Sequence, residues 1–179
     1  PLMQRYVITM KGMLHGDFGE SVVYEGQTLQ DIIREKLPVS ARLGLQSLIF
    51  GVLVGLFLGV IAAVKRDTWI DRAIVVFAVL LMSVPELVLG LVFQKYFAGT
   101  LKWFPVIGWP SGKELWLGGW KYTILPMLSG ALLHIATYSR LLKTSILDVL
   151  DQDYILTARS KGLSEPKIVW SHIMRNSFI

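Results

Sequence analysis

Residues 43–64 read LGLQSLIFGVLVGLFLGVIAAV, and these 22 residues contain no charged side chain. The hydrocarbon core of a bilayer is crossed by about 20 helical residues, so this run predicts a transmembrane helix. The alternative is a buried helix of a large soluble all-α protein, which would need polar caps and amphipathic neighbouring helices to cover it. The stretch therefore favours an integral membrane protein.

Two more apolar runs repeat the pattern. Residues 73–94 contain one charge, Glu86, and residues 122–139 contain none over 18 positions. Because each run is long enough to cross a bilayer as a helix, the sequence predicts an all-α, polytopic transmembrane protein. The predicted elements are three full spans, at 41–64, 73–98 and 122–143, and the start of a fourth at 167–179.

The composition agrees with a membrane protein. Hydrophobic residues make up 53% of the chain and charged residues 17%, below the roughly 25% of a typical soluble domain. The net charge is +5, but the basic residues are scattered between apolar blocks, which suits the lipid bilayer as a partner and not nucleic acid. Cysteine is absent, so neither a disulfide nor a thiolate metal site is possible.

Both ends of the sequence indicate a fragment. The chain begins at Pro1 without the basic segment and short apolar core of a signal peptide, and it stops at Ile179 inside an apolar run. We therefore expect a piece of a longer protein.

The segments that flank the predicted spans differ in charge and aromatic content. Residues 65–72, KRDTWIDR, hold three basic residues and are placed in the cytoplasm by the positive-inside rule, although four lysines in residues 95–121 weaken this signal. Residues 99–121 are then external, and their Trp and Phe side chains, with Tyr122 directly after them, predict a loop at the membrane surface. Residues 1–40 are predicted to be external too, with a short amphipathic helix that Thr28 caps and Pro38 closes.

Three glycines recur every four residues in the first span. Gly51, Gly55 and Gly59 lie on one face of the predicted helix, the small-xxx-small spacing that lets helix backbones approach closely in lipid. The pattern favours contact with another helix on this face, while the general abundance of glycine in membrane spans is the other explanation.

A polar helical stretch follows the third span. Residues 154–163, YILTARSKGL, predict a short helix with Ala158 and Gly162 on a small-residue face and with Arg159 and Lys161 on other faces. Gly162 suits the C-terminal cap of this helix. Such a helix is shaped to sit in a groove on another protein, and the alternative is a solvated connector between spans.

This stretch carries a resemblance. Residues 147–176, LDVLDQDYILTARSKGLSEPKIVWSHIMRN, resemble the cytoplasmic loop of the inner-membrane permease subunits of ABC importers, and most closely the dipeptide/oligopeptide permease branch. Ala158 and Gly162 match the second alanine and the glycine of the family pattern Glu-Ala-Ala-x3-Gly-x9-Ile-x-Leu-Pro. The sequence departs from that pattern at Leu156, Thr157, His172 and Arg175. Tyr-x-x-Thr-Ala-Arg-x-Lys-Gly-Leu is nevertheless the usual form of this loop in the peptide branch.

The resemblance extends along nearly the whole chain. Four further segments resemble the peptide branch in order and spacing: GDFGES (16–21), REKLPVSARLGL (34–45), KRDTWIDR (65–72) and FPVIGWPSG (104–112). The fold implied is that of a type I ABC importer permease, with one span in a missing N-terminal piece and the last two completed by a missing C-terminal piece.

The resemblance implies a role and partners. The chain would be the permease subunit of an ATP-driven peptide importer in the bacterial or archaeal cytoplasmic (inner) membrane, without enzyme activity and without a cofactor. Its partners would be ATP-binding subunits, a second permease subunit in a heterodimer, and a substrate-binding protein. The coupling loop, 144–166, would dock on the ATP-binding subunit through Tyr154, Ala158, Arg159, Lys161 and Gly162. The phosphate loop G-x-x-x-x-G-K-[ST] does not occur, so the ATP would be hydrolysed elsewhere.

Pro85 and Glu86 are candidates for the translocation path. An ionisable side chain inside a span is costly there and is a functional candidate by default. The alternatives are a protonated or paired glutamate, or one close enough to the interface to reach water. Pro85 removes a backbone donor and predicts a kink in the span. His134 in the third span is predicted to be a packed or hydrogen-bonded side chain, and no metal site is predicted.

Other functions remain open at this stage. Within the same branch, the substrates include nickel complexes and oligosaccharides. An ion-driven secondary transporter would be built from repeats that these three spans do not show. A membrane-embedded enzyme centred on Glu86 and His134 would need a nucleophile or metal motif that the sequence lacks.

Overall fold

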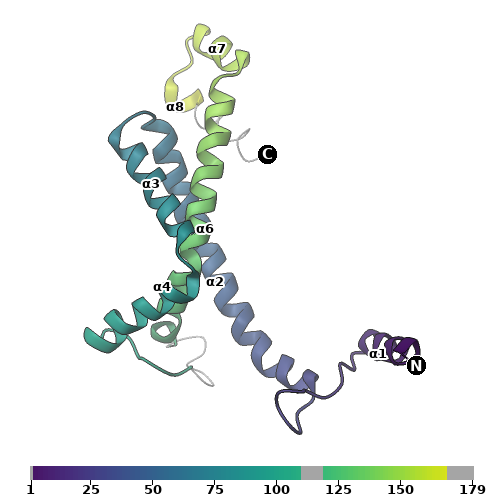
Figure 1. The fold of residues 1–179 in the computed structure, drawn as a ribbon. Helices are drawn as coiled ribbons and strands as arrows, with labels where there is room; N and C mark the ends of the chain where they lie inside the picture. The colour runs from purple at the N-terminus through teal and green to yellow at the C-terminus, as the bar shows by residue number, and fades with distance from the viewer. Residues whose placement is uncertain (1, 110–118, 169–179) are drawn as a thin grey trace. The chain divides into compact units, whose positions relative to one another are not determined.

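The computed structural model describes residues 2–109 and 119–168, and in these ranges the chain is helical (Figure 1). It divides into two compact units, Pro1–Gly44 and Leu45–Ile179. The elements are α1 (Leu2–Leu14), α2 (Leu29–Val64), α3 (Trp69–Ser83), α4 (Glu86–Phe93), the π-helix η1 (Gln94–Thr100), α6 (Trp120–Leu150), α7 (Asp153–Ser160) and α8 (Glu165–Ile168).

The N-terminal unit joins α1 to the start of α2 through a compact turn. Gly19 adopts a φ of +81°, and its N–H donates to Asp17 Oδ1 at 3.0 Å. Thr28 caps α2, because its Oγ1 accepts from the Asp31 N–H at 3.3 Å and donates to Asp31 Oδ2 at 2.6 Å. The predicted cap at Thr28 is therefore confirmed.

The predicted end of this helix at Pro38 is wrong. Helix α2 continues through Pro38 as one 36-residue helix that ends at Val64. A proline in a helix leaves the carbonyl four residues earlier without its donor, and this carbonyl belongs to Arg34. Arg34 and Pro38 are both exposed, so water can satisfy the carbonyl and the helix survives.

In the C-terminal unit, α2 and α6 run parallel along a seam of small residues. A Cβ on Gly55 would lie 3.0 Å from the Ile135 carbonyl oxygen, and one on Gly59 would lie 2.8 Å from that of Ser139. Gly51 approaches Ala131 and His134 in the same way. The expectation that this glycine face meets another helix is thus confirmed, since only glycine leaves room for such an approach.

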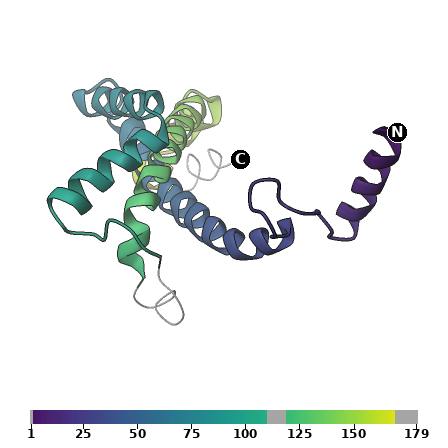
Figure 2. The same cartoon turned by 60° about the horizontal axis from the view of Figure 1, so that its bottom comes forward.

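The second predicted span is not one continuous helix. Helix α3 ends at Ser83, and the segment Glu86–Thr100 continues at 98° to it after a break at Val84 and Pro85. Figures 1 and 2 both show α4 turning away from α3 at this point. Proline has no N–H and disfavours helical geometry in the residue before it, so the predicted kink is a full break.

The described residues contain fewer clear spans than the three that the sequence predicts. By length and composition, α2 is apolar enough to cross a membrane, and α3 with α4 and η1 makes a second span only if the bent pair counts as one. Helix α6 covers the predicted span at 122–143 but does not reach the same hydropathy, because polar residues such as Thr123 and His134 interrupt it. Three full spans therefore remain a prediction, as does the start of a fourth at 167–179, most of which lies outside the described residues.

The external loop predicted at 99–121 is described only as far as Trp109 and from Gly119 onward. Its first part folds back on η1, where the ring centroids of Phe97 and Trp103 lie 5.8 Å apart. Gln94 Nε2 also donates to the Val106 carbonyl at 2.7 Å. Aromatic side chains therefore do gather beside this end of the broken helix.

Candidate functional site

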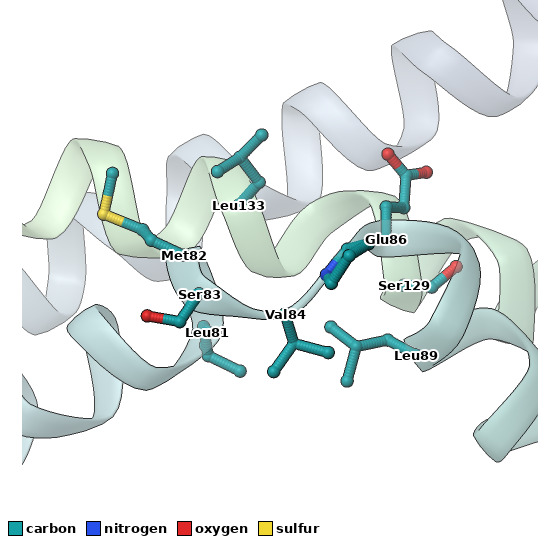
Figure 3. Close-up of a pocket in the computed structure, with 9 residues that line it drawn as sticks. Leu81, Met82, Ser83, Val84, Glu86, Leu89, Ser129 and Leu133 are labelled. Atoms are coloured by element: carbon teal, nitrogen blue, oxygen red, sulfur yellow. The ribbon is translucent and has the colours of Figure 1, made fainter.

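The break between α3 and α4 forms one wall of a cavity of about 250 Å³. Helix α6 forms the other wall, and Figure 3 shows the lining side chains around the break. The lining is mainly apolar, with one carboxylate and two hydroxyls: Leu81, Met82, Ser83, Val84, Pro85, Glu86, Leu89, Ser129 and Leu133. Both residues predicted for the translocation path, Pro85 and Glu86, thus border this cavity.

Glu86 reaches the point where three helices meet. A Cβ on Gly130 of α6 would lie 2.9 Å from Glu86 Oε1 of α4 and 2.9 Å from Ser47 Oγ of α2. Any side chain at position 130 would therefore displace the carboxylate or the hydroxyl. Ser47 in turn donates to the Met127 carbonyl at 3.1 Å. Neither Ser47 nor Gly130 was singled out from the sequence, because this contact joins residues far apart in the chain.

His134, the other polar residue noted in the third span, packs in the seam. It contacts Gly51, and its ring lies 6.4 Å from that of Tyr138. Among the described residues, no group of three or more His, Cys, Asp or Glu side chains is placed to hold a metal ion.

Helix α7 is seated on the adjoining ends of α2 and α6. Ile155 is 0% exposed and Ala158 is 5% exposed, and both join a buried cluster with Ala63, Leu142 and Ile146. The buried face explains why this short polar helix forms at all, since eight residues are too few for a stable isolated helix. The cluster fixes α7 against the end of the helix pair.

Gly162 ends α7 as the sequence predicts. Its φ is +75°, and the Leu163 N–H beyond it donates to the Ala158 carbonyl at 3.3 Å. This six-to-one hydrogen bond across a left-handed glycine is the Schellman motif. The predicted C-terminal cap is confirmed, and Leu163 packs against the same buried cluster.

The five predicted docking residues do not share one face. Ala158 points into the chain's own core, while Tyr154 is 40% exposed and Lys161 and Gly162 are exposed. Tyr154 also takes part in a contact within the chain. Arg159 lies in α7 between these positions. The outward face also includes Leu156, which is 57% exposed and which the sequence marked only as a departure from the family pattern.

An ion pair between α6 and α3 was not predicted from the sequence. Lys143 Nζ of α6 donates to Asp71 Oδ1 of α3 at 2.5 Å, with side-chain exposures of 20% and 7%. Asp71 Oδ2 also accepts from the Asp67 N–H at 3.2 Å. The signal available in the sequence was an acidic residue inside the basic turn 65–72, but its partner lies 72 positions away.

Comparisons with known proteins give this geometry a context. Residues 55–179 match the family described as binding-protein-dependent transport system inner membrane component. The oligopeptide transport system permease protein OppB of Salmonella typhimurium is 35% identical over 179 residues, which make up 100% of this chain and 56% of that protein. The dipeptide transport system permease proteins DppB of Lactococcus lactis and of Bacillus subtilis are each 36% identical over the same shares. The chain spans about half the length of the curated relatives it matches.

Proposed function

The chain belongs to the family of binding-protein-dependent transport system inner membrane components, a family of membrane transport proteins and not of enzymes, and from this premise we propose its function. It is a permease subunit of an ATP-driven ABC importer, held in the bacterial cytoplasmic membrane by several helices. It forms part of the translocation path together with a second permease subunit. A substrate-binding protein delivers the solute, and separate ATP-binding subunits drive its passage.

The solute is a peptide. This assignment is supported by the relatives, which are named as oligopeptide and dipeptide permeases and match the chain over its full length. Nickel complexes and oligosaccharides are the alternatives within the same branch, and competition with a labelled peptide in an uptake assay separates the three classes.

The ATP-binding subunit docks on the exposed face of α7. The observation that carries this proposal is the division of α7 into two faces, with Ile155 and Ala158 buried at the ends of α2 and α6 and with Leu156 exposed, as is Lys161 directly after the helix. A helix anchored in this way passes a push on its outer face to the helix pair beneath it. Ala158 then acts by seating α7, and contact with the partner falls to Tyr154, Arg159, Lys161 and Gly162.

The translocation path passes the helix break. Pro85 ends the continuous helix, and Glu86 brings a carboxylate to the cavity wall where α4 meets α6. Broken helices in membrane transporters place polar groups beside a solute in this manner.

A charge reversal at Lys161, directly after α7, tests the docking. In the intact transporter complex, Lys161→Glu is expected to lose the ATP-binding subunit on co-purification and to lose ATP-dependent peptide uptake in proteoliposomes. Lys65→Glu is the matched control, since Lys65 is also exposed and lies in the turn directly after α2, at the same end of this unit, but does not adjoin α7 in the chain. Ala158→Glu is unsuitable, because it would place a charge in the buried cluster and unfold the seat of α7.

The two variants must first reach the membrane in equal amounts, as judged by immunoblotting. If Lys161→Glu then binds the ATP-binding subunit and transports peptide at the unmodified rate, α7 is a solvated connector and the proposed docking is wrong. If both variants lose the ATP-binding subunit equally, the docking surface is the whole charged end and not α7.

A further inference from the structure

The cavity at the helix break is rich in hydrogen-bond acceptors. Pro85 has no N–H, so the Leu81 carbonyl lacks the donor that a continuous helix would supply four residues on. The chain turns by 98° after Ser83, and no backbone hydrogen bond joins Glu86 or Leu87 to α3 across the described break. The last carbonyl groups of α3 are therefore unpaired at the cavity wall, where the helix dipole is negative.

Two hydroxyl groups line the cavity and add further acceptors. Each of them already donates its proton to a backbone carbonyl: Ser83 to Val79 at 2.8 Å and Ser129 to Pro126 at 2.9 Å. Because a hydroxyl has one proton and two lone pairs, what these groups still offer is lone pairs. A ligand that donates several hydrogen bonds fits such a lining.

The charge of the cavity is negative. Within the described ranges, no basic side chain lies within 4.0 Å of the Glu86 carboxylate, although Arg140 contacts the sulfur of Met82 at 3.5 Å. Figure 3 shows Met82 and Glu86 at opposite sides of the cavity. The N-terminus of α4 brings about half a positive charge to the break, which offsets the C-terminus of α3. Glu86 is the one ionisable side chain among the residues that line the cavity.

The lining suits an organic cation better than a metal ion. Calcium takes six to eight oxygen ligands, whereas most of the side chains that border this cavity are apolar. A volume of about 250 Å³ lies below the range of roughly 300–1,000 Å³ for complete ligand pockets, so it holds one end of a larger molecule. An ammonium group on a short hydrocarbon chain combines the required charge, donors and apolar surface.

We infer that Glu86 and the helix break form a subsite for the ammonium group of the transported solute. This inference rests on the proposed transport function and adds to it the part of the solute that this chain recognises. Glu86 accepts the ammonium protons together with the unpaired carbonyls of α3, while Val84, Leu89 and Leu133 cover the adjoining methylene or methyl groups. Gly130 is needed because a side chain there would displace the carboxylate.

Carbodiimide labelling of the intact complex in membranes tests the subsite without requiring transport. The labelling rate of Glu86 is measured by mass spectrometry in the presence of trialanine, N-acetyl-trialanine or sodium chloride at equal concentration. Trialanine at about ten times its Kd is expected to slow the labelling about tenfold, since only about one site in eleven is then free to react. N-acetyl-trialanine and sodium chloride are expected to leave the rate unchanged. Glu25, which is exposed in the N-terminal unit, serves as the control carboxylate.

Equal labelling of Glu86 under all three conditions overturns the subsite, and protection by sodium chloride alone assigns the cavity to a metal cation instead. The variant Glu86→Gln is then compared with the unmodified complex for uptake of trialanine. If uptake depends on ATP but neither protection nor a slower rate in Glu86→Gln is found, the transport function stands and the subsite fails. If Glu86 is protected while no peptide is taken up, the subsite stands and the proposed peptide importer fails.

Discussion

Lys143 Nζ lies 2.5 Å from Asp71 Oδ1, and this ion pair joins the first turn of α3 to α6 close to the seat of α7. The carboxylate is the more buried partner, at 7% exposure against 20% for the lysine side chain. A buried charge that loses its partner costs more than the pair itself contributes. The two ends of the pair should therefore respond differently to substitution.

Lys143→Met is expected to lower the free energy of unfolding by about 2–3 kcal/mol, because it leaves the Asp71 carboxylate buried without a cation. Asp71→Asn should cost less, since the amide oxygen can still accept from the Asp67 N–H and the lysine can extend to water. Thermal unfolding of the purified complex, followed by circular dichroism, measures both. Asp67→Asn is the control with no expected change, because this side chain is 85% exposed and asparagine tolerates the φ of 64° found there. Equal losses for all three variants would contradict a buried pair.

The glycine seam predicts a sharp difference between two glycine-to-alanine changes in one helix. Gly59→Ala places a methyl group 2.8 Å from the Ser139 carbonyl oxygen, so backbone must move, at a cost of about 1–3 kcal/mol. Gly44→Ala meets nothing within 4 Å and should stabilise α2 by about 0.5–1 kcal/mol, because alanine loses less entropy in a helix. The same unfolding assay compares them, and similar effects at both positions would show that the seam is looser than described.

Gly162 predicts a graded response to side chains at the end of α7. Its φ of +75° costs an ordinary residue roughly 1–2 kcal/mol, and asparagine pays less than a β-branched residue. Gly162→Val should therefore release the Leu163 amide from its bond to Ala158, while Gly162→Asn should retain it. The rate of hydrogen exchange at the Leu163 amide measures the difference between the two variants. Equal protection in both variants would mean that the left-handed cap does not hold α7 in place.

Pro38→Ala tests whether α2 is continuous. The substitution gives residue 38 an N–H that can donate to the Arg34 carbonyl, so it is expected to stabilise the helix by about 1–3 kcal/mol. The new amide at position 38 should be as protected from hydrogen exchange as its helical neighbours. Rapid exchange at this position would instead support the helix end that the sequence pattern suggested.

Local signals predicted well wherever one stretch of chain decides the outcome. The cap at Thr28, the left-handed glycine at Gly162 and the glycine face of α2 all depend on side-chain chemistry within a few residues, and all three are confirmed. Pro38 and Pro85 show the limit of such signals. Both were expected to disturb a helix, yet α2 passes through the first and the chain breaks at the second.

Contacts between distant segments lay beyond the sequence. Whether Ala158 faces a partner or its own chain depends on where α7 meets α2 and α6. The helical periodicity of residues 154–163 does not contain this information. The meeting of Glu86 with Gly130 and the pairing of Asp71 with Lys143 have the same origin. The sequence identified Glu86 as unusual, but the group that surrounds it required the fold.

The seam between α2 and α6 also raises a question of register. Glycines spaced every four residues would accept the same neighbour after a slip of one step, about 6 Å at 1.5 Å per residue, so the seam alone does not fix the alignment. The alignment is fixed by Ser47 and Ala63, which continue the four-residue spacing of the glycines at the two ends of the seam. At one end Ser47 would lose its bond to the Met127 carbonyl, and at the other Ala63 would leave the buried cluster under α7. The two helices are therefore held in one alignment at both ends.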